Sequence, residues 1–507
     1  MTQTEHVHQK LSFREKAGYS LGDIATNFFF MSMLIYQSRF YTDTVGLSPV
    51  AVGWMFILVR WADALFDPLV GALSDRTETR WGKFRPWVLF TAVPFGLVFW
   101  LTYTTPHFGP TGKLIYAYIT YVLAMALYSA NNTPYSALMG VMTPDASERS
   151  SIATYRFFAA IVIGQLLIQA LALPLVDKFG QGDSAKGWSI TMGIFGASMV
   201  VLYLLSFLST RERMQPDPKQ KSRFSDDVKD LFMCRPWIVM FILTLFAFTT
   251  LFLRGGAMNY YFAYYLDKGA IRGFLDKVGL ASLGAGQVTG WKSVLNALGL
   301  IVKPDGSNAA SVGFAFFLVT GNLIQIIGIL ASKPLADRFS KKAVFIGGMG
   351  FSTIITALVF VVPPGAVTLL FVLSLLWGVG WGFTIPLLWV MMADVADYSE
   401  WTNSRRATGL IFAGIVFALK AGVGLGGALN GWLLAAYGYV PNVAQSAQAL
   451  LGIRLSATIY SAIPFVLGLV CLMMYPISKE LNLRIQDELA ERRKKFATEN
   501  PAVPEAL

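Results

Sequence analysis

The sequence predicts an all-α membrane protein with twelve transmembrane helices in two pseudo-symmetric six-helix bundles. Of its 507 residues, 55% are hydrophobic and only 14% are charged, and the mean hydropathy is +0.53. A soluble protein of this length has too little interior to bury so much apolar surface. The apolar residues also form long blocks, each near or above the ~20 residues that a spanning helix needs.

Twelve such blocks are present, and a long polar stretch divides them six and six. Several contain Gly or Pro, which membrane helices tolerate because neighbouring helices satisfy the freed backbone groups. In chain order the predicted spans cover residues 19–42, 50–74, 86–106, 114–141, 152–177, 188–209, 236–265, 310–332, 343–362, 365–395, 408–436 and 454–476.

The distribution of Lys and Arg predicts how the chain is oriented. With twelve spans, both termini and the loops after even-numbered spans share one side, and most of the 41 basic residues fall there. The positive-inside rule therefore predicts cytoplasmic termini. It also accounts for the net charge of +11, so no nucleic-acid partner is needed. The N-terminus lacks the apolar core of a cleavable signal, and we expect a bacterial-type cytoplasmic (inner) membrane protein.

These observations divide the chain into four parts. We expect an N-terminal bundle at 1–209, a cytoplasmic central loop at 210–235, a C-terminal bundle at 236–476 and a cytoplasmic tail at 477–507. The second bundle contains an extracytoplasmic insertion at 266–309, which is too long for a simple turn. Within it, FLDKVGL and WKSVLNALGLIV predict short amphipathic helices at the membrane surface. The insertion is either a packed surface element or a lid over the entrance.

A weak internal repeat supports the division into two bundles. GALSDRTETRWGK follows span two and KPLADRFSKK follows span eight, as a duplication of six helices predicts. Each stretch holds an Asp-Arg pair that can latch helix ends on the cytoplasmic side; the alternative is ordinary positive-inside charge. With a third pair at the inner end of span ten, the predicted gate residues are Asp75, Arg76, Asp337, Arg338, Asp394 and Arg405.

Two carboxylates interrupt the apolar sequence of the second span. Asp63 and Asp67 are four residues apart, and Arg60 precedes Asp63 by three, so all three share one helical face. A charge at this depth costs about 2.5–3.5 kcal/mol on insertion scales, so it is usually functional. Paired acids bind Na⁺ through their oxygens or share a proton. Alternatively, Arg60 neutralises one acid in a structural ion pair.

At this point the chain resembles a known family. YTDTVGL (41–47), DALFDPLVGALSDRTETRWGKFRPW (63–87), MADVADYSEW (392–401) and PNVAQSAQALLGI (441–453) are similar to motifs of the glycoside–pentoside–hexuronide:cation symporters, the melibiose-permease-like branch of the major facilitator superfamily. The resemblance covers nearly the whole chain outside 266–309. RGGAMNYY and RRATGLIFAGIVFALK are closest to the xyloside carriers. The resemblance to this family implies a central sugar site and alternating access.

The resemblance also implies a cation site. Asp63 and Asp67 match the family's cation-binding carboxylates, and Ser129 on span four matches a hydroxyl that can add an oxygen ligand. Phe66 stands where the family has an amide ligand, which weakens Na⁺ binding and slightly favours H⁺. Lys420, well inside span eleven, matches an intramembrane lysine and is expected to couple cation occupancy to the sugar site. No other metal or cofactor is implied.

The sugar site is expected to combine hydrogen-bonding groups with an aromatic platform. Asn27 and Asn132 stand where melibiose permease has carboxylates, so melibiose-like specificity is in doubt. Arg156 matches a family arginine, with pairing to another helix as its alternative. Asp23 is expected instead to hold the cytoplasmic end of span one. The complete predicted substrate set is Asn27, Asn132, Arg156, Tyr135, Trp389 and Arg254.

The predicted function is cation-coupled symport of a glycoside, with H⁺ or Na⁺ as the coupling ion and a xyloside or related oligosaccharide as the substrate. A hexuronide substrate and a non-transporting membrane sensor on the same fold are the alternatives. An enzyme is not expected, because the sequence has no P-loop or zinc motif and no histidine inside a span. The expected partners are a small-molecule glycoside, the coupling cation and the lipid bilayer, and we expect a monomer.

Overall fold

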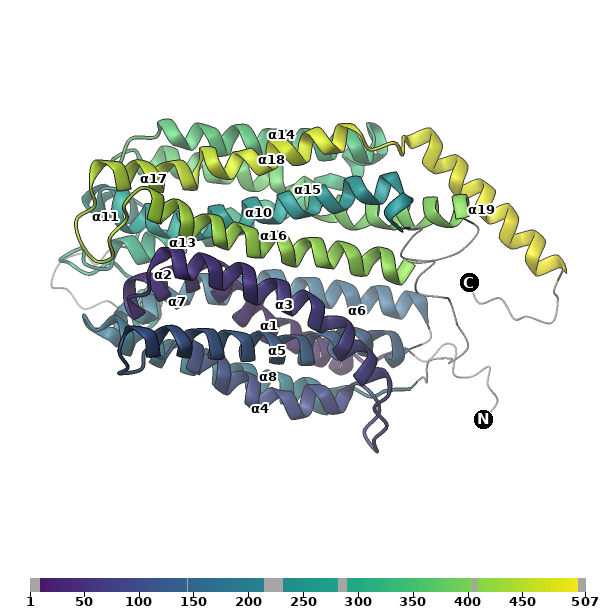
Figure 1. Ribbon diagram of the computed structural model, residues 1–507, viewed down its shortest axis with the longest axis horizontal. Helices are drawn as coiled ribbons and strands as arrows, with labels where there is room; N and C mark the ends of the chain where they lie inside the picture. Colours follow the sequence, from purple (N-terminus) through teal and green to yellow (C-terminus); the bar gives the residue numbers. More distant parts are fainter. Residues whose placement is uncertain (1–9, 144, 214–230, 281–289, 404–407, 500–507) are drawn as a thin grey trace.

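The computed structural model describes residues 10–143, 145–213, 231–280, 290–403 and 408–499, and these form an almost entirely helical protein (Figure 1). The only β pairing among them is an isolated bridge between Thr79 and Gly82. The first bundle consists of α1 (Phe13–Ile35), α2 (Gln37–Arg39), η2 (Phe40–Val45), α3 (Pro49–Asp75), α4 (Arg85–Thr102), α5 (Pro110–Met142), α6 (Ala146–Phe158), η3 (Ala159–Gln165), α7 (Leu166–Gly180) and α8 (Ser184–Ser209).

The second bundle lies alongside the first, with its helices nearly parallel to the same long axis (Figure 1). It consists of α10 (Arg235–Tyr260), η4 (Tyr261–Tyr265), α11 (Lys268–Lys277), α12 (Trp291–Ala297), α13 (Ala309–Arg338), α14 (Lys341–Leu358), η5 (Val359–Val361), α15 (Val367–Asn403), α16 (Thr408–Ala436), α17 (Ala447–Ala457) and α18 (Ile459–Met473). A last helix, α19 (Lys479–Glu499), projects at an angle from one end (Figure 1).

Eleven helical stretches in the described part of the chain are long and apolar enough to cross a membrane. The twelfth bundle helix is α1, which falls outside that set because its apolar part, residues 18–35, also contains Asp23, Asn27 and several small polar residues. It nevertheless packs lengthwise against α8 and η3. Together these helices give the predicted two bundles of six.

The bundles meet along two helix pairs, α3 with α16 and α7 with α13. The first contact is close because glycines form a stripe on α16: Gly424 packs on Arg60, Gly427 on Phe56, and Gly431 on the backbone at Pro49. Small residues allow membrane helices to approach in this way. Lys420 lies one turn before Gly424 on the same stripe. The packing therefore directs Lys420 toward α3.

The first helix of each bundle loses its α-helical geometry at the same end of the molecule. There α1 leads through α2 into η2, and α10 leads into η4; both η segments are π-helical. We call this the α11 end and the opposite one the α19 end (Figure 1). Single π-helical turns are frequent at functional sites, because they redirect side chains that a regular helix would place elsewhere.

The connection from α3 to α4 is held by a carboxylate from beyond α8. Glu212 accepts hydrogen bonds from the backbone N–H groups of Lys83, Phe84 and Arg85 at 2.8–2.9 Å. An anion at the start of α4 satisfies otherwise unpaired donors and opposes the helix dipole. Gly82 precedes them with φ of 108°, and a side chain there would collide with Glu212. The RWGKFRPW sequence thus forms a compact cap.

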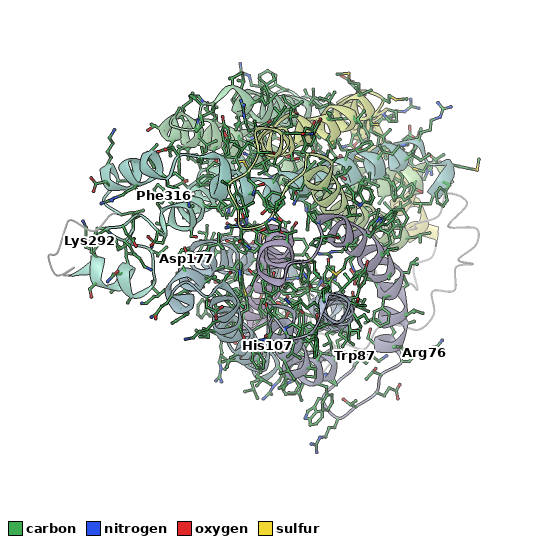
Figure 2. All side chains as sticks on the ribbon, turned by 60° about the vertical axis from the view of Figure 1, so that its left-hand side comes forward. Arg76, Trp87, His107, Asp177, Lys292 and Phe316 are labelled. Carbon is green, nitrogen blue, oxygen red and sulfur yellow. The ribbon has the colours of Figure 1, made fainter. Side chains whose placement is uncertain are left out.

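The long segment between η4 and α13 forms the two predicted short helices and contacts both bundles. Ile271 and Leu275 of α11 are buried, and Ile271 packs on Gly313 of α13. Lys178 of α7 donates hydrogen bonds to the carbonyl groups of Asn296 and Ala297 at the end of α12. Figure 2 shows Lys292 of α12 and Asp177 of α7 on this side of the molecule. The segment therefore bridges the bundles at the α11 end.

Candidate functional site

The structure brings the predicted cation residues into one cluster between the bundles. Lys420 Nζ lies 2.8 Å from Asp63 Oδ2 and 2.6 Å from Asp67 Oδ2. Ser129 Oγ donates a 2.6 Å hydrogen bond to Asp63 Oδ1 and lies 3.4 Å from Lys420 Nζ. The ammonium group therefore bridges the two carboxylates.

The alternative in which Arg60 neutralises an acid is only partly realised. Arg60 Nη1 lies 3.9 Å from Asp63 Oδ2, beyond hydrogen-bond distance, and another of its nitrogens contacts the sulfur of Met33. Both acids have their close ion pair with Lys420 instead. The four charges of the cluster sum to zero, which is the arrangement a low-dielectric interior requires.

The two carboxylates differ in their exposure. The side chain of Asp63 is fully buried, whereas that of Asp67 is 24% exposed. Phe66 beside it is 37% exposed and contributes no oxygen ligand. The ring of Tyr128 lies 5.8 Å from Lys420 Nζ. Asp67 is therefore the more accessible of the two acids.

A second cluster forms around Arg156, and here the structure corrects an expectation. Asp23 does not hold the end of α1 but accepts Nε of Arg156 at 2.9 Å and its Nη2 at 3.0 Å. Tyr135 donates to the same carboxylate at 2.6 Å. The earlier prediction failed because Asp23 lies ten residues into α1, deep enough to need a partner of opposite charge. Arg156 thus pairs with another helix, α1, which was the alternative to a role in sugar binding.

Tyr135 offers no open face for stacking. Its ring is fully buried and lies 4.6 Å from the ring of Tyr19, nearly parallel to it. The two tyrosines also exchange hydrogen bonds, each hydroxyl donating to the other's backbone carbonyl. In this structure the predicted platform therefore ties α1 to α5, and Tyr135 contributes its hydroxyl group to Asp23 rather than a free surface.

The two predicted amides lie beside these clusters. Asn27 Nδ2 donates to the carbonyl of Asp23 at 2.9 Å, and Asn132 Nδ2 lies 3.5 Å from the hydroxyl of Tyr128. Both side chains are half-buried. Asn132 thus connects through Tyr128 to the Lys420 cluster, and Asn27 connects to the Arg156 cluster. Tyr128 was not among the residues predicted from the sequence, although it lies next to both Asn132 and Lys420.

Among the described residues, no hydrogen bond, ion pair or ring contact links Arg254 or Trp389 to either cluster. Arg254 is buried, and its guanidinium group stacks on Trp377 at 4.1 Å from the ring centre, with no described acid within ion-pair distance. Trp389 is 37% exposed. The stacking partner of Arg254, Trp377, was not among the predicted residues, because nothing in the spacing of α10 and α15 predicts their relative rotation.

The predicted gate residues do not form the expected pairs in the described part of the chain. Asp75, Arg76, Asp337 and Arg338 are exposed and make no ion pair there; Figure 2 shows Arg76 at the periphery. Asp394 pairs with Lys341 at 2.7 Å and accepts a hydrogen bond from Asn482, which ties α14 and α19 to α15. Its proposed partner Arg405 lies outside the described residues.

The chain matches the family of MFS/sugar transport proteins over residues 18–299 and 306–479. The match runs through most of the 266–309 segment, so the expectation that this segment lies outside the family resemblance was wrong. Within it, α11 buries Ile271 and Leu275, whereas α12 buries none of its residues.

Two sequence relatives and one solved structure illustrate the similarity. The chain is 34% identical to the inner membrane symporter YicJ of Escherichia coli (strain K12), over 96% of both chains. It is 31% identical to an isoprimeverose transporter of Lactiplantibacillus pentosus, over 97% of this chain and 94% of that protein. The crystal structure of the nucleoside transporter NupG superposes with a TM-score of 0.61 at 11% identity, over 92% of this chain and all of that one.

Proposed function

The chain belongs to the MFS/sugar transport protein family, and from this premise we propose that it carries a glycoside across the membrane together with one cation, by alternating access. Membership makes it a transporter rather than an enzyme. The observation that carries the proposal is the position of Lys420 between Asp63 and Asp67. We further propose that it acts as a monomer in a cytoplasmic membrane, with both termini in the cytoplasm.

Coupling follows from competition for the same two carboxylates. A cation that binds Asp67, the more exposed acid, weakens the hold of that acid on Lys420. Lys420 lies on α16 and the acids lie on α3, so this contact is between bundles. Cation binding therefore changes how the bundles attract each other at the middle of the membrane, which is where alternating access needs control.

The coupling cation is H⁺ or Na⁺, and the cluster makes the two distinguishable. Na⁺ needs several oxygen ligands, and here Asp63, Asp67 and Ser129 can provide them, while Phe66 provides none. A proton needs only one carboxylate. Removal of Ser129 is therefore expected to weaken Na⁺ coupling strongly and H⁺ coupling only slightly.

A neutral glycoside suits the substrate site better than a hexuronide. Arg156 already pairs with the carboxylate of Asp23, so its charge is compensated before any substrate arrives. Asn27 and Asn132 add uncharged donors and acceptors. One relative is named as an isoprimeverose transporter. We therefore propose that the substrate is a xyloside. Its proposed contacts are Asn27, Asn132, Arg156 and Trp389, with Arg254 as a further contact from the second bundle.

Uptake into proteoliposomes tests the proposal. A labelled xyloside should accumulate above its external concentration when a pH or Na⁺ gradient is imposed, and Asp63→Asn or Asp67→Asn should abolish accumulation. Asp305→Asn is the matched control, because this exposed acid bonds to Ser307 in its own turn. Accumulation that persists in both cluster variants would refute the cation site, and competition by glucuronides but not xylosides would refute the substrate assignment.

A further inference from the structure

Two motifs that the transport cluster leaves without a role meet at the α11 end. YTDTVGL (41–47) forms most of η2, and PNVAQSAQALLGI (441–453) connects α16 to α17 and begins α17. Asn442 Nδ2 donates a 2.6 Å hydrogen bond to the backbone carbonyl of Asp43. Segments about 400 residues apart in the sequence, one from each bundle, are thus joined at one residue.

The carboxylate of Asp43 is surrounded by donors on both of its oxygens. Oδ1 accepts from the hydroxyl groups of Tyr439 at 2.6 Å and Thr42 at 2.8 Å. Oδ2 accepts from the hydroxyl of Tyr264 at 2.6 Å and from Arg39 Nε at 3.2 Å. Such short bonds to an ionised oxygen are about twice as strong as neutral ones. Arg39 and Thr42 belong to the first bundle, and Tyr264 and Tyr439 belong to the second.

The neighbours of Asp43 extend the same closure. Arg39 Nη1 donates to Asn259 Oδ1 at 2.9 Å, and Asn259 in turn donates to the carbonyl of Ile35 at 3.2 Å. The hydroxyl groups of Thr42 and Tyr260 lie 2.8 Å apart. Each of these contacts again joins the first bundle to the second.

Local backbone geometry supports a specific role for the contacts around Asp43. Asp43 and Tyr264 both lie in π-helical segments, η2 and η4, at matching positions of the two bundles. Asn442 has φ of 60°, in the left-handed region that asparagine tolerates better than most residues. Burial and the nearby charge of Asp43 raise the pKa of Tyr439, so its hydroxyl group stays a donor.

We propose that Asp43 is the positioning residue that holds the α11 end of the carrier closed, and that this end opens when Tyr264, Tyr439 and Asn442 withdraw from it together. The proposal rests on the alternating access proposed above. An uncharged amide at position 43 would present two N–H donors among groups that are themselves donors. Because the amide keeps only one acceptor oxygen, it would weaken the side-chain contacts that Tyr264 and Tyr439 make from the second bundle.

The reporter for opening is Ser38→Cys in a chain whose own cysteines are replaced, Cys234→Ala and Cys471→Ala. Ser38 is 3% exposed and lies within hydrogen-bond distance of Tyr260 and Asn430 of the second bundle, behind the Asp43 closure. In lipid nanodiscs, Asp43→Asn should raise the rate of maleimide labelling at position 38 by about tenfold or more. Tyr439→Phe removes one donor and should raise it by a smaller factor.

Asp305→Asn is the matched control, because Asp305 bonds only to Ser307 in its own turn at the same end. It should leave labelling unchanged. If Asp43→Asn fails to fold, the labelling rate of Tyr439→Phe tests the proposal by itself. Labelling within twofold of the parent in every folded variant would overturn the proposal. The labelling experiment needs no sugar, so it tests the closure separately from the proposed function. If Asp43→Asn raises labelling but the parent chain shows no cation-driven uptake, the closure stands and the proposed function is refuted.

Discussion

At the residue scale, Lys420 is the side chain on which the central cluster depends. Its removal leaves the buried Asp63 and the partly buried Asp67 without their close cation, which is expected to cost about 3–5 kcal/mol of stability. Asp63→Asn in the same chain should restore part of that loss, because one uncompensated charge disappears. Thermal unfolding in detergent of Lys420→Ala, Asp63→Asn and the double variant measures this coupling. Strictly additive losses would show that the two groups do not interact.

Glu148 provides a pH-dependent contact outside the spanning segments. Hydrogen bonds from Lys16, above all, and from the backbone of Leu11 lower the pKa of its carboxyl group. Because the folded pKa is depressed, the contact stabilises the protein above the unfolded value of about 4.5 and is lost as the pH falls through the folded value.

The Glu148→Gln variant should therefore unfold at a slightly lower temperature than the parent chain at pH 7. That difference should shrink as the pH falls below the unfolded value of about 4.5 and disappear once the carboxyl of the folded parent chain is protonated as well. Unfolding temperatures of both chains measured across this range test the prediction. A difference that stays constant with pH would mean that the Lys16 contact contributes nothing through its charge.

At the element scale, the glycine stripe of α16 sets the distance to α3. A side chain at Gly431 would collide with the backbone at Pro49. Gly431→Val is expected to cost about 1–3 kcal/mol through overpacking and to displace Lys420 from Asp63. Gly347→Ala on α14 is the matched control, since a methyl group there meets nothing within 4 Å. Equal unfolding temperatures for the two variants would contradict the tight packing of α3 on α16.

At the scale of the whole molecule, the segment from α11 to α13 joins the bundles and should restrict their movement. A flexible bis-maleimide between Lys178→Cys and Ala297→Cys, in a chain without native cysteines, is expected to stop sugar uptake. Exposed positions 305 and 272 on the same segment give a control crosslink within one bundle, which should leave uptake intact. Full uptake with the first crosslink in place would show that α12 need not leave α7.

The architecture was predictable because long apolar blocks, a polar midpoint and a repeated Asp-Arg pattern are properties of the sequence alone. Helical spacing likewise predicted that Asp63 and Asp67 share a face. It did not predict that Lys420 lies between them, since this depends on how α16 is rotated against α3, although Gly424, Gly427 and Gly431 mark that face. Asp23 and Asp43 were missed as hubs for a related reason: their partners lie on helices distant in sequence.

The ion pairs of Lys420 have an electrical consequence. With no ion bound, Asp63, Asp67, Lys420 and Arg60 together carry no net charge. In the transport cycle proposed above, the unloaded carrier would therefore reorient without moving net charge of this cluster through the membrane field, and voltage should leave that step nearly unchanged. A carrier loaded with one cation and a neutral glycoside moves one charge, which is about 2.3 kcal/mol per 100 mV. Because Lys420 neutralises the unloaded cluster, the voltage dependence of the proposed cycle is expected in the step that moves the loaded carrier.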